Sequence, residues 1–171
     1  MPLPRAPDRL PAEMAEALGH AVAGFGFLEE ALKRAIFSLT RQDIEPADEA
    51  ALERWLRRMD EIADDTLGTL IDSFLAAARR SGIDDHAQLA EDLAGTRRMR
   101  NLLCHASWRP GAQPGHWHPT FINTKGERHP SDMTPDDLHA VQAETLRLAR
   151  RVVSIMRATG IDGRWAGHAE D

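Results

Sequence analysis

The sequence is poor in cysteine and in long apolar runs. Its single cysteine, Cys104, excludes a disulfide within the chain. No run of about 18 uncharged apolar residues occurs, so the sequence predicts no membrane-spanning helix. Residues 1–8 contain three prolines and no apolar stretch, which is not the pattern of a signal peptide. We therefore expect a cytoplasmic protein that makes no contact with a membrane.

Charge is unevenly distributed along the chain, whose formal net charge is -6. Residues 43–65 carry nine acids against three arginines, whereas residues 97–109 and 147–157 each carry four arginines and no acid. A chain that is acidic overall is a poor general binder of nucleic acid. Any contact with an anionic partner should therefore be confined to one of the two basic segments.

Apolar residues recur at spacings of three and four, which predicts helices. With 171 residues and 42% hydrophobic content, we expect one helical domain at residues 11–159, after an extension at 1–10 and before a tail at 160–171. The fold class is all-α, an up-down bundle of about five helices with an irregular loop or short β-hairpin between the last two. The expected helices are residues 11–40, 48–62, 67–81, 86–107 and 135–159. The third could also continue the second after a bend at Gly68.

Residues 109–133 form the one non-helical insert. His116–Ile122 and Glu127–His129 could pair as a hairpin across Asn123–Gly126, although Pro119 and Pro130 weaken strand pairing. In a strand, His116 and His118 share one face, and His129 would lie across the turn, so the three could bind a transition metal. A closed zinc site needs four ligands and no cysteine pair is near, so we predict a surface or packing role and no metal or other cofactor.

The basic segment 97–109 lies at the end of the fourth predicted helix. On a helical wheel one side carries Leu89, Leu93, Thr96, Met99 and Leu103, which predicts the core face. Asn101, His105 and Trp108 form a stripe on roughly the opposite side, with Arg97 and Cys104 at its edge. Arg100 lies about 140° from His105 and reaches the same place only if its long side chain swings around.

The order Arg100-Asn101-x-x-x-His105 resembles the R-N-x-x-x-H motif of the HEPN superfamily. The resemblance implies a helical bundle whose penultimate major helix carries the motif, and a homodimer in which two motifs line one cleft. It also implies a metal-independent endoribonuclease, often a toxin or phage-defence effector held in check by a separate antitoxin. We therefore assign His105 as the general acid or base, Arg100 as the phosphate clamp and Asn101 as the positioning residue.

The remaining basic and aromatic residues of the segment, Arg97, Arg98, Trp108 and Arg109, are the predicted RNA contacts. Structural alternatives exist for most of these side chains. His105 could simply be a cation at a helix C-terminus, Arg100 a buried partner of Glu29 or Glu30, and Asn101 a cap or bridge. Trp108 and Trp117 could close the end of the bundle. The rival function is a non-catalytic helical module that binds RNA, a nucleotide or a protein.

Overall fold

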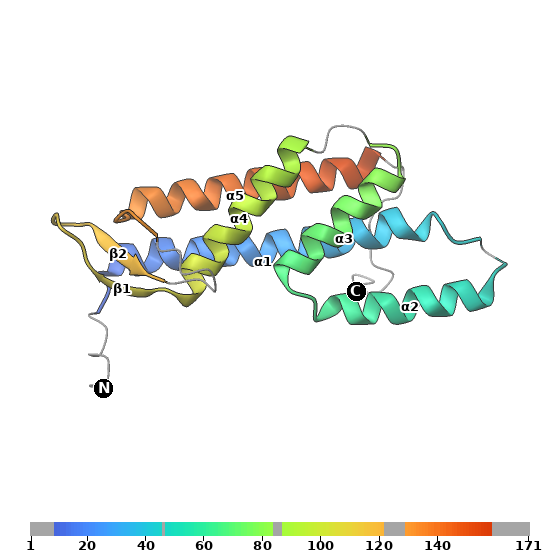
Figure 1. The fold of residues 1–171 in the computed structure, drawn as a ribbon, viewed down its shortest axis with the longest axis horizontal. Coiled ribbons are helices and arrows are strands. Elements are labelled where there is room, and N and C mark those ends of the chain that lie inside the picture. Colours follow the sequence, from blue (N-terminus) through green and yellow to red (C-terminus); the bar gives the residue numbers. More distant parts are fainter. Residues whose placement is uncertain (1–8, 46, 84–86, 122–128, 159–171) are drawn as a thin grey trace, which may run out of the picture. The chain divides into compact units, whose positions relative to one another are not determined.

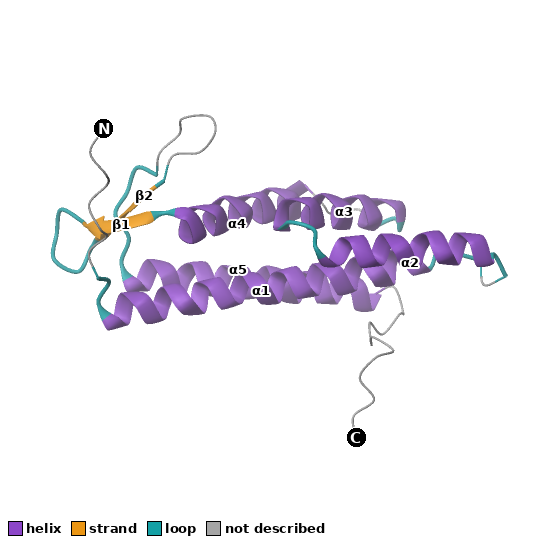
Figure 2. Cartoon of the chain, turned by 90° about the horizontal axis from the view of Figure 1, so that it is seen from below, coloured by secondary structure: helices purple, strands orange, loops and turns teal. Residues whose placement is uncertain are grey.

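The described part of the chain is built from helices and one short pair of strands (Figure 1 and Figure 2). The computed structural model describes residues 9–45, 47–83, 87–121 and 129–158. Within them the elements are α1 (Ala12–Arg41), α2 (Glu49–Ala63), α3 (Leu67–Arg80), α4 (Ala87–His105), β1 (Ser107–Pro110), β2 (Trp117–Thr120) and α5 (Pro135–Ala158). The predicted all-α fold with five helices is confirmed. In this described part of the chain, no helix is long and apolar enough to cross a membrane.

The chain divides into two compact units, and α1, α4 and α5 each contribute to both. The hairpin unit comprises Met1–Phe25 and Thr96–Thr145, and the α2–α3 unit comprises Gly26–Gly95 and Leu146–Asp171. Residues 11–159, which the sequence predicted as one helical domain, thus supply both units. The predicted motif lies in the hairpin unit.

In the α2–α3 unit, α2 is fastened to the second half of α1 by one aromatic cluster. Trp55 Nε1 donates to Thr40 Oγ1 at 2.9 Å, and the Trp55 ring lies 4.6 Å from that of Phe37. Lys33 Nζ donates to the Ala63 carbonyl oxygen at 2.7 Å, where α2 ends. The unit's core is made by buried residues of all five helices, among them Leu28, Leu32, Ile36, Ile62, Leu70, Phe74, Leu89, Leu148 and Val152.

The helix ends of this unit follow local capping chemistry. The Asp48 side chain accepts from the Ala51 amide at 2.9 Å, which confirms the predicted start of α2. Thr66 caps α3 in the same way, so α2 and α3 are separate helices and not one helix bent at Gly68. Gly82 ends α3 with φ of 70°, a conformation that favours glycine. The caps predicted for α4, Asp84 and Asp85, lie outside the described residues.

In the hairpin unit, aliphatic and aromatic residues from α1, α4, the strands and α5 share one core. Its buried members include Met14, Phe25, Leu102, Leu103, Trp108, Trp117, Met133 and Leu138. α5 begins as predicted. Thr134 Oγ1 accepts from the Asp137 amide at 3.3 Å, and Asp137 Oδ2 accepts from the Thr134 amide at 2.8 Å. This reciprocal pair satisfies two donors that a helix start otherwise leaves without partners.

The strand pairing differs from the prediction. β2 pairs antiparallel with β1, and α4 ends at His105 rather than at Ser107. Most of the predicted partner segment, Glu127–His129, lies outside the described residues. The predicted turn at Asn123–Gly126 lies outside the described residues. Trp117 exchanges both of its backbone hydrogen bonds with Met133, at 2.8 and 2.7 Å, on the edge away from β1. Because backbone donors alternate along a strand, Pro119 removes no donor from the β1 ladder.

Two expectations about α1 and α2 are also corrected. The spacing of apolar residues predicts Val22 and Leu56 on the apolar faces of their helices, yet they are 41% and 49% exposed. Both lie about 100° around the helix from a residue that is buried, Ala21 and Trp55, so spacing alone put them one position off the core face. Gly24 and Gly26 within α1 could allow close approach of another backbone, or could mark a kink or mere tolerance. A Cβ added at Gly24 would lie nearest to the side chains of Gln142 and Thr145 in α5.

Candidate functional site

The last two turns of α4 separate a buried face from an exposed basic face. Leu102 and Leu103 are 5% and 4% exposed and join the core of the hairpin unit. Arg97, Arg98, Cys104 and His105 are exposed, and Asn101 is half-buried. Arg97, Asn101 and His105 follow one another at spacings of four residues, so they lie on the same side of the helix. This arrangement matches the predicted stripe, except at its Trp108 end.

The Arg100 side chain turns toward this stripe. Its Nη1 atom donates to Asn101 Oδ1 at 3.3 Å, and the residue is half-buried rather than buried. The wheel position of Arg100 had placed it nearer the core. A three-carbon stem lets the guanidinium leave the direction of its Cβ, and the Asn101 amide oxygen holds it at the new place. Arg100 and Asn101 are therefore brought together, with His105 one turn further along.

His105 is the last residue of α4 and remains exposed. Its ring stacks on that of Phe121, with centroids 6.3 Å apart and planes inclined by 23°. Phe121 directly follows β2, so the residue after the hairpin's second strand contacts one face of the imidazole. Phe121 contacts a face of the ring, whereas both nitrogens, the polar atoms of the side chain, lie on the ring edge. A cation is also favoured at this helix end, so the structural alternative for His105 agrees with the same position.

The two remaining predicted RNA contacts lie in β1 and not on α4. Trp108 is 6% exposed and packs in the hairpin unit's core, which is the structural alternative given for it. Its ring has almost no surface on which a base could stack. Trp117, at 8% exposed, does the same. Arg109 is half-buried and lies opposite His118 in the strand register.

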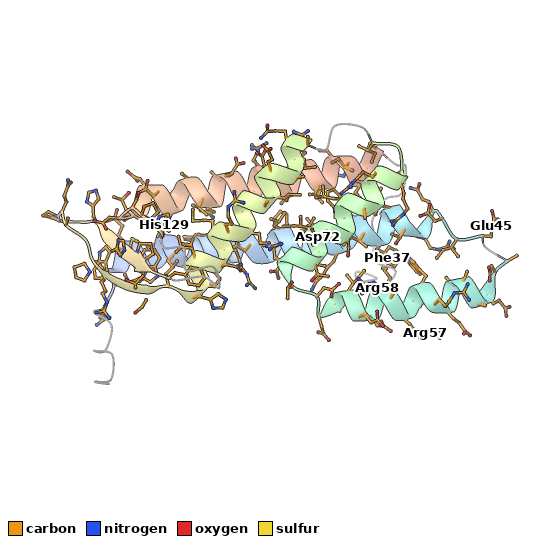
Figure 3. All side chains as sticks on the ribbon, viewed as in Figure 1. Phe37, Glu45, Arg57, Arg58, Asp72 and His129 are labelled. Atoms are coloured by element: carbon orange, nitrogen blue, oxygen red, sulfur yellow. The ribbon has the colours of Figure 1, made fainter. Side chains whose placement is uncertain are left out.

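One histidine of the insert, His118, contacts a carboxylate that sequence reasoning missed. His118 Nδ1 lies 2.9 Å from Asp132 Oδ1, and Asp132 Oδ2 accepts from the Ala112 amide at 3.0 Å. The Ala112 bond, followed by the His118 bond, holds the pKa of Asp132 below its usual value. Partial burial, with the nearby charge of His118, lowers the pKa of His129, which Figure 3 labels near the hairpin.

These groups do not form a metal centre. Across the described residues, no three His, Cys, Asp or Glu side chains converge as metal ligands do. His116 Nδ1 lies 3.2 Å from the Pro114 carbonyl oxygen, within its own turn, so it does not join His118 at a common point. The absence of a metal from the function stays a prediction.

No protein-family model, curated protein or solved structure matches this chain. Function is therefore inferred from the side chains themselves. Two groupings stand out in the hairpin unit: Arg100, Asn101 and His105 at the end of α4, and the histidine–aspartate pair on the hairpin. On α5, Arg147 Nη2 binds Asp92 Oδ2 at 2.9 Å, which makes this basic segment at least partly a structural one.

Proposed function

We propose that this chain is a metal-independent endoribonuclease that acts as a homodimer. The observation that carries the proposal is the bond from Arg100 to Asn101, because it turns the guanidinium toward the side of α4 on which Asn101 and His105, the other two residues of the HEPN-like motif, follow each other at a spacing of four. A permanent cation, an amide and an exposed imidazole then occupy one end of one helix. These groups supply one of the two acid–base side chains that phosphodiester cleavage without a metal requires, together with a cation for the phosphate.

The proposed reaction uses the RNA's own 2′-hydroxyl group as the nucleophile. Its oxygen attacks phosphorus as a base removes the proton, and the bond from phosphorus to the 5′-oxygen breaks as an acid protonates the leaving group. The products are a 2′,3′-cyclic phosphate and a 5′-hydroxyl. His105 acts as the base or the acid, because imidazole titrates near neutral pH. Arg100 holds the phosphate oxygens with its planar fork, and Asn101 positions the guanidinium.

A dimer enters the proposal because the motif contains one imidazole, whereas acid and base are two roles. A two-fold axis would bring His105 of a second copy to the same phosphate. Exposure of Arg97, Arg98 and His105 is consistent with a shared basic cleft of this kind. By its resemblance to HEPN toxins, we further propose that the enzyme is a toxin or phage-defence effector with a separate antitoxin.

The decisive experiment incubates the purified protein with RNA in EDTA. We expect fragments that end in a 2′,3′-cyclic phosphate, from a particle that light scattering shows to be a dimer. His105→Ala should slow cleavage by about 10²- to 10⁴-fold, the usual contribution of acid–base catalysis. Arg100→Lys should also lose activity, because lysine keeps the charge but not the fork.

His20→Ala is the matched control, since His20 is another exposed helical histidine, placed beside Glu16 on α1. It should cut like the wild type. The nuclease is refuted if the folded wild type leaves RNA intact, or if the His105→Ala variant cuts RNA as well as the wild type. Either result favours the non-catalytic helical module. A strictly monomeric enzyme that still cuts refutes the composite site.

A further inference from the structure

The outer face of the hairpin carries a row of polar side chains. In the antiparallel register Ser107 lies opposite Thr120, and Arg109 opposite His118. Directly opposed residues share a face of the sheet, with Cβ atoms about 4.5–5.5 Å apart. Trp108 and its partner Pro119 occupy the other face and are buried. Arg109 and His118 are therefore neighbours on the side that faces away from the core.

Asp132 completes this row on the far side of His118. The antiparallel bridge between Trp117 and Met133 sets Asp132 beside His118, and their side chains meet at 2.9 Å. Gly111 leaves room for the carboxylate, since a Cβ there would lie 2.8 Å from Asp132 Cγ. The order across the sheet is thus arginine, histidine and aspartate.

The chemistry of the row follows from what each group can donate. An ionised carboxylate only accepts, so the His118 nitrogen that faces Asp132, Nδ1, carries a proton. The second nitrogen, Nε2, then points to the opposite side of the ring and donates when the ring is protonated. The His118 side chain is 38% exposed, against 25% for Asp132. Within the described residues, no carboxylate pairs with the Arg109 guanidinium, so the row presents this guanidinium outward and, while the imidazole is protonated, the His118 Nε2–H group as a second donor.

We propose that Arg109 and His118 bind a backbone phosphate of the RNA next to the one that is cut, and that Asp132 positions the His118 ring. This subsite rests on the proposed nuclease function. Arg109 follows His105 by four residues, which can span at most about 14 Å of chain. An RNA strand that has one phosphate at His105 can therefore place a nearby phosphate at the hairpin.

The test measures binding of a 2′-O-methyl oligoribonucleotide, which has no 2′-hydroxyl to react. Fluorescence anisotropy over a salt series gives the affinity and its salt dependence. We expect Arg109→Gln and His118→Gln each to weaken binding about 10-fold and to lower the slope of log K against log salt by about 0.7. Arg57→Gln, which removes an exposed arginine of α2 beside Glu53, should leave the slope unchanged.

Asp132→Ala tests the positioning role by the ¹⁵N spectrum of the imidazoles, in which His118 should lose its preference for a proton on Nδ1. If the wild type binds and cuts RNA while Arg109→Gln and His118→Gln bind as tightly as it does, the subsite alone is wrong. A wild type that neither binds nor cuts RNA removes both the subsite and the nuclease. An unchanged His118 ring in Asp132→Ala refutes the positioning.

Discussion

Gly24 offers a test of how closely α1 and α5 approach each other in the hairpin unit. The residue is buried in the middle of α1, and an added Cβ would lie 3.7 Å from Gln142 Cγ and 3.8 Å from Thr145 Cγ2. Both distances are ordinary van der Waals contacts. Gly24→Ala should therefore fit without any movement of α5.

The expected gain has two parts. Replacing a helix-interior glycine by alanine stabilises a helix by about 1 kcal/mol, and burying one methyl group adds up to about 0.8 kcal/mol. Gly24→Ala should thus stabilise the fold by about 1–2 kcal/mol. For a chain of this size the melting temperature should rise by about 2–8 °C.

Gly26→Ala is the natural comparison, because Gly26 is exposed and an added Cβ there meets nothing within 4 Å. Gly26→Ala should gain only the stabilisation that comes from replacing glycine by alanine within a helix, about 1 kcal/mol. Urea unfolding followed by circular dichroism at fixed protein concentration measures both, with the m-value unchanged. A Gly24→Ala protein that is less stable than the wild type would show that the helices pack more tightly than these distances allow. A weakened dimer would instead place Gly24 at the interface.

Three further substitutions test local structure. Thr134→Ala removes the cap of α5 and should cost about 1 kcal/mol. Bonds from Thr134 lower the pKa of Asp137, so the stabilisation by these bonds is complete above the unfolded pKa, near pH 4, and is lost as pH falls through the folded pKa. The loss of stability in Thr134→Ala should therefore be smaller in acid. Equal losses at pH 3 and pH 7 would contradict this role of the bonds. Trp108→Ala should lower the free energy of unfolding in urea by about 3–5 kcal/mol, because the ring is part of the core. A stable variant with weakened RNA binding would instead indicate that Trp108 contacts RNA. Gly111→Ala should displace the Asp132 carboxylate and lower the stability of the fold. In an Asp132→Ala background the same substitution should cause little further loss of stability. Additive losses in this double-mutant cycle would contradict the contact.

The parts of the fold that the sequence predicted are those decided within a few residues. The start of α5 followed from Thr134 and Asp137, which bond to each other three positions apart. The core face of α4 followed from its period, and Leu89, Leu93 and Thr96 are all buried. In both cases the side chains that decide the structure are neighbours in the chain, so no knowledge of distant segments is needed.

The strand pairing and the polar row depended on contacts that no local pattern encodes. β2 had two possible partners, and the choice of β1 follows from burying Trp108 and Trp117 in one core. Asp132 meets His118 only because Met133 bridges Trp117. A wheel likewise gives the direction of a Cβ and not of a guanidinium, which is why the place of Arg100 beside Asn101 required the structure.

In a chain of net charge -6, a basic site stays basic only if nearby carboxylates are hydrogen-bonded to groups other than its arginines. In the hairpin unit Asp132 is bound by the Ala112 amide and His118, and Asp137 by Thr134. A carboxylate that already accepts several hydrogen bonds competes poorly for a neighbouring arginine, and its charge is partly balanced by those donors. The positive charges of Arg97, Arg98 and Arg109 are therefore left to act on an anionic ligand. Because such a local field is screened beyond about 10 Å at 0.1 M salt, RNA binding should depend on these side chains far more than on the net charge of the chain.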